Sequence, residues 1–119
     1  MIVEMALAGH LFVQAVAARC SGESSRAVHA CACTVRNRLA AGWSERRVLE
    51  AYYAPDVRPT EQALAEAERG LSGEGCEDSW YFIISPSDAV HLGWDVKDAA
   101  ESVGGVLLYP RSQWGRHNG

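Results

Sequence analysis

The sequence predicts a single domain, residues 1–119, of the α+β class, mostly helical with a short antiparallel sheet. A chain of 119 residues can bury one sizeable core. Up to residue 71, helix-capping residues precede apolar side chains at helical spacing, and turn residues separate these segments. After residue 79, two short runs rich in β-branched and aromatic residues indicate strands.

The first predicted helix covers residues 3–18 and is apolar on nearly every side. It is too short and too polar to span a bilayer, and it lacks the basic start and cleavage site of a signal peptide. We therefore expect it to be buried on most sides, through the centre of the domain, or else to form an interface with a protein partner. It should end near Arg19, because residues 21–25 are turn formers.

Three further helices have recognisable start signals. They are predicted over residues 26–41 after Ser24 or Ser25, 44–53 after Ser44, and 60–71 after Thr60. The first of these has an apolar face at helical spacing, formed by Val28, Ala32, Val35 and Leu39.

The last third of the chain has a different pattern. Residues 80–84 and 106–109 are predicted strands that would pair antiparallel, and Pro86 ends the first of them. Residues 95–102 are predicted as one short helix between the strands, and residues 113–119 as a polar tail.

Composition and charge exclude several classes of protein. Hydrophobic residues make up 48% and charged residues 22%, which excludes long disorder, collagen and coiled coil as the main architecture. The net charge is −4, and a nucleic-acid binder usually has a basic face. The candidate basic cluster is Arg36, Arg38, Arg46 and Arg47. We expect these arginines to lie on solvated helix faces, and we predict no nucleic-acid partner.

The four cysteines are too few for a disulfide scaffold. His29-x-Cys31-x-Cys33 has the look of a metal motif, but on a helix Cys31 and Cys33 point in nearly opposite directions and cannot share a metal. We therefore predict buried thiols, Cys31 in particular, with no metal and no cofactor.

Several short motifs occur in a fixed order. Gly22-Glu23 is followed after thirteen residues by Asn37-Arg38 in an alanine- and valine-rich helix, and residues 59–72 form an alanine-rich helix before a glycine. Next come Tyr81-Phe82, Ser85-Pro86, Trp94 and the strand 106–109. In this order, over about residues 11–110, the chain resembles the SleB-type cell-wall hydrolases, the spore-cortex-lytic enzyme family.

The resemblance implies a lysozyme-like fold and the cleavage of peptidoglycan glycan strands, often as a lytic transglycosylase. Such cleavage needs a carboxylic acid that protonates the glycosidic oxygen. In the family this acid is the first glutamate of an E-A-R-G-E motif, where this chain has Arg19, which cannot deliver a proton near neutral pH. The family's Q-F is replaced by Pro55-Asp56-Val57, and its asparagine by Ser85. We therefore expect a peptidoglycan-directed domain whose catalysis is impaired.

The resemblance also supplies the candidate site residues. Glu23 either replaces the missing acid, with Arg19 nearby, or is structural, capping a helix and pairing with an arginine. Asn37 and Arg38 either orient the Glu23 loop or are ordinary exposed polar residues. Tyr81 and Trp94 either stack on sugar rings or belong to the core.

Three classes of function stay open at this point. The chain is a muralytic enzyme with a rearranged acid, a catalytically inactive glycan-binding module, or a structural component of a phage particle or secretion machine. The expected partners are peptidoglycan strands or another protein of a larger assembly, located in the cell wall or the phage particle.

Overall fold

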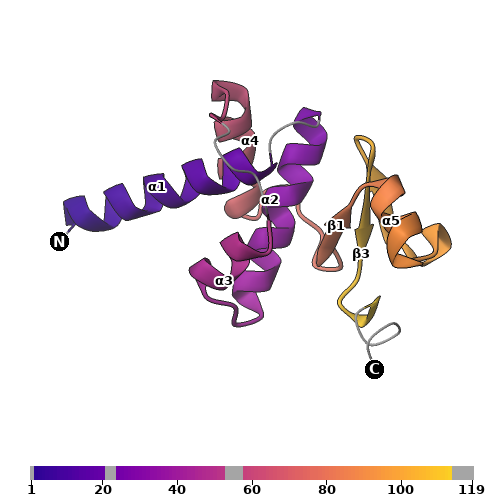
Figure 1. The fold of residues 1–119 in the computed structure, drawn as a ribbon. Helices are drawn as coiled ribbons and strands as arrows, with labels where there is room; N and C mark the ends of the chain where they lie inside the picture. The colour runs from indigo at the N-terminus through magenta and orange to yellow at the C-terminus, as the bar shows by residue number, and fades with distance from the viewer. Residues whose placement is uncertain (1, 21–23, 53–57, 114–119) are drawn as a thin grey trace.

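The computed structural model describes residues 2–20, 24–52 and 58–113, with side chains from residue 11 onward. Helices α1 to α4 lie together, and a three-stranded antiparallel sheet with the short helix α5 lies beside them (Figure 1). The predicted α+β class with a short antiparallel sheet is thereby confirmed. The lysozyme-like arrangement stays a prediction.

The first four helices follow the capping signals closely. Their bounds are Ile2–Cys20 for α1, Ser25–Ala40 for α2, Glu45–Glu50 for α3 and Glu61–Leu71 for α4. Ser24, Ser44 and Thr60 each cap the helix that follows them by accepting a hydrogen bond from a backbone N–H three residues later. The helix α3 ends at Glu50, earlier than the predicted residue 53.

Helix α2 is the centre of the fold. It packs against α1, α3 and α4 on one side and against the sheet on the other. Its approach to α4 is very close, because a Cβ atom built on Gly70 would lie 2.5 Å from the Cβ atom of Ala32. Small residues on α2 and the glycine on α4 therefore allow the two backbones to pack tightly.

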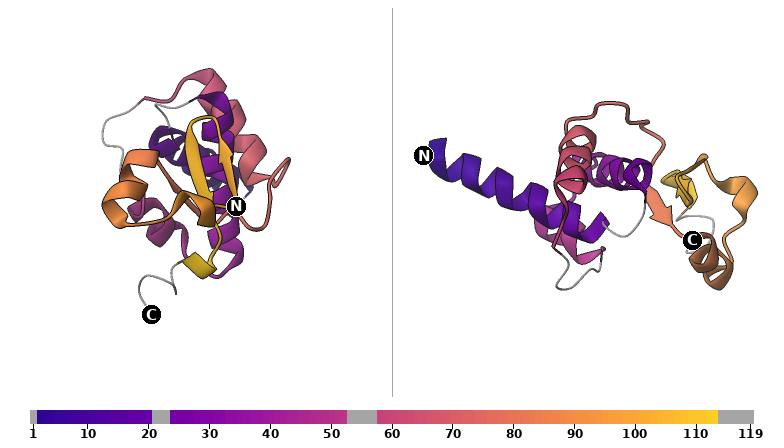
Figure 2. Two further views of the ribbon diagram at one scale, coloured as in Figure 1. Left: turned by 90° about the vertical axis from the view of Figure 1, so that its right-hand side faces the viewer. Right: turned by 90° about the horizontal axis from the view of Figure 1, so that it is seen from above.

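Helix α1 does not run through the centre of the domain. Its first half extends beyond the other elements (Figures 1 and 2). Among its described side chains, Val16, Ala17 and Cys20 are buried, whereas Leu11 is 58% exposed. The expectation of a helix buried on most sides is therefore wrong, since the described core contacts come from its last turns. The part of the chain that the structure describes contains no helix long and apolar enough to cross a bilayer.

The sheet has the order β1-β3-β2, with β1 Phe82–Ile84, β2 Glu101–Val103 and β3 Val106–Tyr109. Both strand pairs are antiparallel, with Phe82 opposite Tyr109 and Val103 opposite Val106. The central strand β3 is buried on both faces: Leu108 packs toward α2, and Leu107 packs on the side of α5 (Figure 1). The sheet thus forms a middle layer between α2 and α5.

Two elements differ from the expectations. Residues 95–102 form a short 3-10 helix, Val96–Asp98, followed by β2, because Gly104-Gly105 adopt positive φ angles and turn the chain back into a hairpin. Helix α5, Pro86–Leu92, was not predicted, although Ser85 caps it and Pro86 is its first residue. Gln113, predicted in a polar tail, is fully buried, and the rest of that tail lies outside the described residues.

Candidate functional site

The cysteines correct the prediction of buried thiols. Cys20 at the end of α1 is bonded to Cys31 on α2, and Cys33 on α2 is bonded to Cys76 in the loop after α4. Cys31 is buried as expected, but it is a disulfide cysteine. Because Cys31 and Cys33 point to opposite sides of α2, each reaches a different neighbour, so two bridges suffice to join three segments of the fold.

Asn37 is a buried link between α2 and the segment that leads into the sheet. It is 8% exposed, and its Nδ2 donates to the carbonyl oxygens of Glu77 at 2.9 Å and Trp80 at 2.7 Å. Its Oδ1 accepts from Arg36 at 3.0 Å. The expectation of an exposed polar residue is therefore wrong for Asn37, which positions the approach to β1.

Arg38 lies in a cage of aromatic rings between α2, α3 and the sheet. It is 7% exposed, and its Nε donates to the carbonyl oxygen of Tyr81 at 2.9 Å. Its guanidinium carbon lies about 5 Å from four ring centres, namely Trp43 at 4.9 Å, Tyr52 at 5.1 Å, Phe82 at 5.1 Å and Tyr81 at 5.5 Å. Such contacts stabilise a buried cation through the electron-rich ring faces. Arg38 is thus also buried, and its described partners belong to other segments than the Glu23 loop.

The outer side of this cage is an open pocket, which we call the aromatic pocket. It has a volume of about 410 Å³ and is lined by Ala41, Gly42, Trp43, Arg47, Tyr81, Phe82 and Arg111. The guanidinium of Arg47 lies 4.1 Å from the ring centre of Trp43, and that of Arg111 lies 5.5 Å from the ring centre of Tyr81. Within the described ranges no carboxylate pairs with Arg47 or Arg111. The pocket therefore combines aromatic surface with exposed positive charge.

A second pocket of about 380 Å³ contains Arg19, and we call it the Arg19 pocket. Its walls come from α1, α2, the two residues after α3, β1, the start of α5 and β3, and include Tyr52, Ile84, Ser85 and Asp88. Arg19 is held in place by hydrogen bonds from Nε to the carbonyl oxygen of Leu49 at 2.9 Å and from an Nη to that of Ala15 at 3.3 Å. Arg19 is thus a partly buried cation that ties α1 to α3.

Tyr52 also lines the Arg19 pocket, and its hydroxyl is in a restrained position. It shares a hydrogen bond of 2.6 Å with the hydroxyl of Thr34. Burial raises the pKa of Tyr52, although the nearby Arg38 and the bond with Thr34 oppose the shift. Tyr52 therefore keeps its proton in the neutral range.

The two pockets follow one another along the same pair of elements. On β1 and the residue before it, Tyr81 and Phe82 line the aromatic pocket, and Ile83 and Ile84 line the Arg19 pocket. The α3 segment makes the other wall, with Arg47 in the first pocket and Ala51 and Tyr52 in the second. We call the two pockets together the α3–β1 seam, after β1 and the segment formed by α3 and the two residues that follow it.

Of the expected site residues, Arg19 and Tyr81 line the two pockets of the seam. Arg38 contacts Tyr81 but lines neither pocket, and Asn37 lines another pocket, which also includes Tyr81. Glu23 lies outside the described residues. Trp94 lies elsewhere. Its ring packs edge-to-face against two other rings, with ring centres 5.4 Å from that of Phe82 and 5.0 Å from that of Tyr109. It belongs to the cluster between the sheet and α5, which favours the core alternative.

Trp43, Arg47 and Arg111 were not among the expected site residues. Arg47 was noted only as part of the candidate basic cluster, beside Arg46. The signal that could have drawn attention to Trp43 is its position between Gly42 and Ser44, in the short turn that joins α2 to α3. Arg111 lies two residues after the end of β3, and only the pairing of β3 with β1 brings it to Tyr81.

No protein-family model, curated protein or solved structure matches the chain.

Proposed function

We propose that the domain binds peptidoglycan glycan strands along the α3–β1 seam and hydrolyses them weakly or not at all. The proposal combines the resemblance to SleB-type hydrolases, which puts Arg19 at the position of the acid, with one observation: the Arg19 guanidinium lines a pocket of the seam and donates to the backbone. The lysozyme-like fold and the glycan partner are parts of the same proposal.

The chemistry of the aromatic pocket suits such a ligand. Sugar rings have apolar faces that pack on aromatic side chains, and peptidoglycan carries carboxylates on its peptide stems. Arg47 and Arg111 can form paired, charge-assisted hydrogen bonds with a carboxylate. The half-buried ring of Trp43 and the small exposed part of Tyr81, which is 7% exposed, supply the apolar surface beside them.

The chemistry of the Arg19 pocket argues against efficient cleavage. A glycosidase keeps its acid protonated by placing it in an apolar pocket. The guanidinium of Arg19 instead donates to the backbone carbonyl oxygen of Leu49 on α3, and a guanidinium does not act as a general acid near neutral pH. Asp88, the carboxylate among the described residues that line this pocket, is exposed to solvent at the start of α5.

The first test is muropeptide release from purified sacculi, followed by chromatography. We expect little release by the natural chain and more by Arg19→Glu, which puts a carboxylic acid at the family's position. Arg19→Gln is the matched control, because it also removes the guanidinium but supplies no acid. Strong release by the natural chain that Arg19→Glu abolishes would overturn the assignment.

The second test is sedimentation of the chain with intact sacculi. We expect the double variant Arg47→Gln/Arg111→Gln to bind at least about tenfold more weakly, since a hydrogen bond to a charged group contributes about 1.5–3 kcal/mol. The control Arg46→Gln/Arg69→Gln changes the net charge equally, but on arginines that pair with Glu50 and Glu66 outside the pocket. Equal binding by the two double variants, or no binding by the natural chain, would contradict the proposal.

A second candidate, a structural component of a larger assembly, is favoured by apolar surface. Val90, Leu92 and Val96, on and just after α5, are 77%, 54% and 59% exposed. Light scattering distinguishes it: self-association relieved by Val90→Ser without loss of folding would favour assembly over glycan binding.

A further inference from the structure

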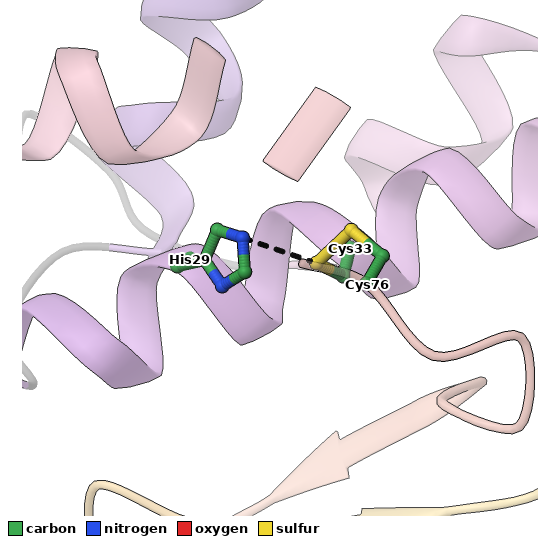
Figure 3. Close-up of side chains that lie close together, drawn as sticks. All are labelled: His29, Cys33 and Cys76. Carbon is green, nitrogen blue, oxygen red and sulfur yellow. Dashed lines mark hydrogen bonds between the residues drawn. A yellow bond between two sulfur atoms is a disulfide. The ribbon is translucent and has the colours of Figure 1, made fainter. Parts of the chain in front are cut away.

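Outside the α3–β1 seam, a group of metal-ligating side chains lies on the opposite side of α2 from Cys31. It consists of His29 and Cys33 on α2 and Cys76 in the loop after α4 (Figure 3). One nitrogen and two sulfur atoms of this group all lie within 4.8 Å of one another. Among the described residues this is the group of three side chains whose composition suits a metal ion.

The positions of these residues follow from helix geometry. His29 and Cys33 are four residues apart, so they lie one turn apart on the same face of α2. The three residues of the pattern His29-x-Cys31-x-Cys33 cannot bind one metal ion together, because residues two apart on a helix point in nearly opposite directions. Cys31 accordingly belongs to the other disulfide. The pair that shares a face is His29 with Cys33, and Cys76 comes to it from a distant part of the chain.

We propose that reduction of the Cys33–Cys76 disulfide converts this group into a binding site for one zinc-class divalent cation, held by both thiolates and the His29 imidazole. Histidine and cysteine are the preferred ligands of such ions, which bind tetrahedrally. Two cysteines and one histidine leave a fourth position for water or another donor.

The distances fit this coordination. With metal–sulfur bonds of about 2.3 Å and metal–nitrogen bonds of about 2.05 Å, tetrahedral ligands place sulfur and nitrogen about 3.6 Å apart. The Nε2 of His29 lies 3.7 Å from the Sγ of Cys33. The main adjustment is that Cys76, on its loop, moves until the two sulfurs are about 3.8 Å apart.

The loop that carries Cys76 is shaped to approach the histidine. The Nε2 of His29 donates to the carbonyl oxygen of Glu74 at 2.5 Å. Gly75 has a φ of +70°, and a Cβ atom there would lie 3.2 Å from Cε1 of His29. Binding through Nε2 requires its hydrogen to leave, and a neutral imidazole can carry that hydrogen on Nδ1 instead. Cys33 is fully buried, whereas His29 and Cys76 are partly exposed, so an ion can reach the site from solvent.

The chemical steps balance with a dithiol reductant. The dithiol gives two electrons and two protons to the Cys33–Cys76 bond and itself becomes a disulfide, leaving two protein thiols. The cation then replaces one proton on each thiol, so two protons are released for each ion bound. In oxidising surroundings the bridge joins α2 to the loop, and in reducing surroundings the metal would join the same two segments.

The experiment compares two variants of the full chain that keep one cysteine pair each. Cys20→Ser/Cys31→Ser keeps the proposed ligands, and Cys33→Ser/Cys76→Ser keeps an equal number of thiols away from His29. Both are reduced with a phosphine, which adds no thiol, and titrated with Co²⁺ as a spectroscopic probe and then with Zn²⁺. We expect the first variant alone to show a thiolate–cobalt charge-transfer band at one ion per chain.

The histidine is tested in the first variant. His29→Ala should weaken Zn²⁺ binding by more than the roughly 10–100-fold that loss of an outer-shell partner costs. His91→Ala, at an exposed position on α5, should leave the affinity unchanged. If the reduced first variant is unfolded, circular dichroism should show that Zn²⁺ restores its helices, and only in that variant.

Three results would overturn the proposal. One is the absence of a cobalt spectrum in the reduced first variant. Another is equal binding by the two cysteine-pair variants. The third is binding that His29→Ala leaves unchanged. If the reduced Cys20→Ser/Cys31→Ser variant stays unfolded at saturating Zn²⁺, this also counts as absence of binding and overturns the proposal.

Discussion

Replacing Asn37 by alanine removes the amide that joins α2 to the segment before β1. The buried carbonyl oxygen of Trp80 then loses this donor, whereas that of Glu77 still accepts from the backbone N–H of Trp80. A buried carbonyl left without a donor costs about 1–3 kcal/mol, and alanine's better helix propensity returns about 0.5 kcal/mol. We therefore expect the free energy of unfolding to fall by about 0.5–2.5 kcal/mol.

Urea denaturation with both disulfides intact measures this loss, and an unchanged dependence on urea would show that the folded state keeps its compactness. Asn37→Asp is the matched variant of the same shape. At pH 7 its carboxylate faces two carbonyl oxygens and cannot donate, so the loss should be at least as large as for alanine. Near pH 3 the protonated carboxyl group can donate one hydrogen bond, so Asn37→Asp should then lose less unfolding free energy than Asn37→Ala.

A loss below about 0.5 kcal/mol in both variants at pH 7 would refute the reasoning, because it would mean that water replaces the lost donor at little cost. The same result would weaken the inference that Asn37 positions the segment before β1. Asn37 would then become available again as a ligand-contacting residue.

Three further outcomes are expected. Gly70→Ala should lower the melting temperature, because its Cβ would lie 2.5 Å from that of Ala32; in an Ala32→Gly background the effect should shrink. Ser24→Ala should cost about 1–2 kcal/mol in thermal or urea unfolding, since Ser24 caps α2 and also donates to the carbonyl oxygen of Gly104 at 3.1 Å. Tyr52 has a raised pKa through burial, so the folded state holds its proton longer than the unfolded state. Stability should therefore fall as the pH rises above about 10, and less steeply in Tyr52→Phe; parallel curves for the two proteins would contradict this.

Local signals explain the parts of the fold that could be predicted. Ser44 and Thr60 were sufficient to place the starts of α3 and α4, because a cap is a contact within four residues. Helix α5 has the same signal in Ser85-Pro86, but its seven residues are too few for an apolar period to emerge. Strand β2 was taken for helix because a three-residue edge strand has no pattern of its own.

The candidate site was less predictable because it depends on long-range contacts. The sequence singles out Arg38 only as part of a basic cluster and through the resemblance, and its burial depends on rings contributed by the segment after α3 and by β1. The disulfides likewise depend on where α1 and the loop after α4 meet α2. Spacing along one helix showed that Cys31 and Cys33 have different neighbours, but it could not show which neighbours they are.

The two disulfides also have consequences for the order in which the chain oxidises. Their cysteines are 11 and 43 residues apart, so loop closure favours Cys20–Cys31 by about 1.2 kcal/mol, or roughly eightfold. The incorrect pair Cys20–Cys33 spans thirteen residues, and chain entropy hardly distinguishes it from the correct one. The distinction comes from α2, which turns Cys33 away from Cys20 once the helix has formed. A helical α2 therefore favours correct pairing when the first sulfur–sulfur bond closes, and an incorrect bond closed earlier must be exchanged by thiolate attack.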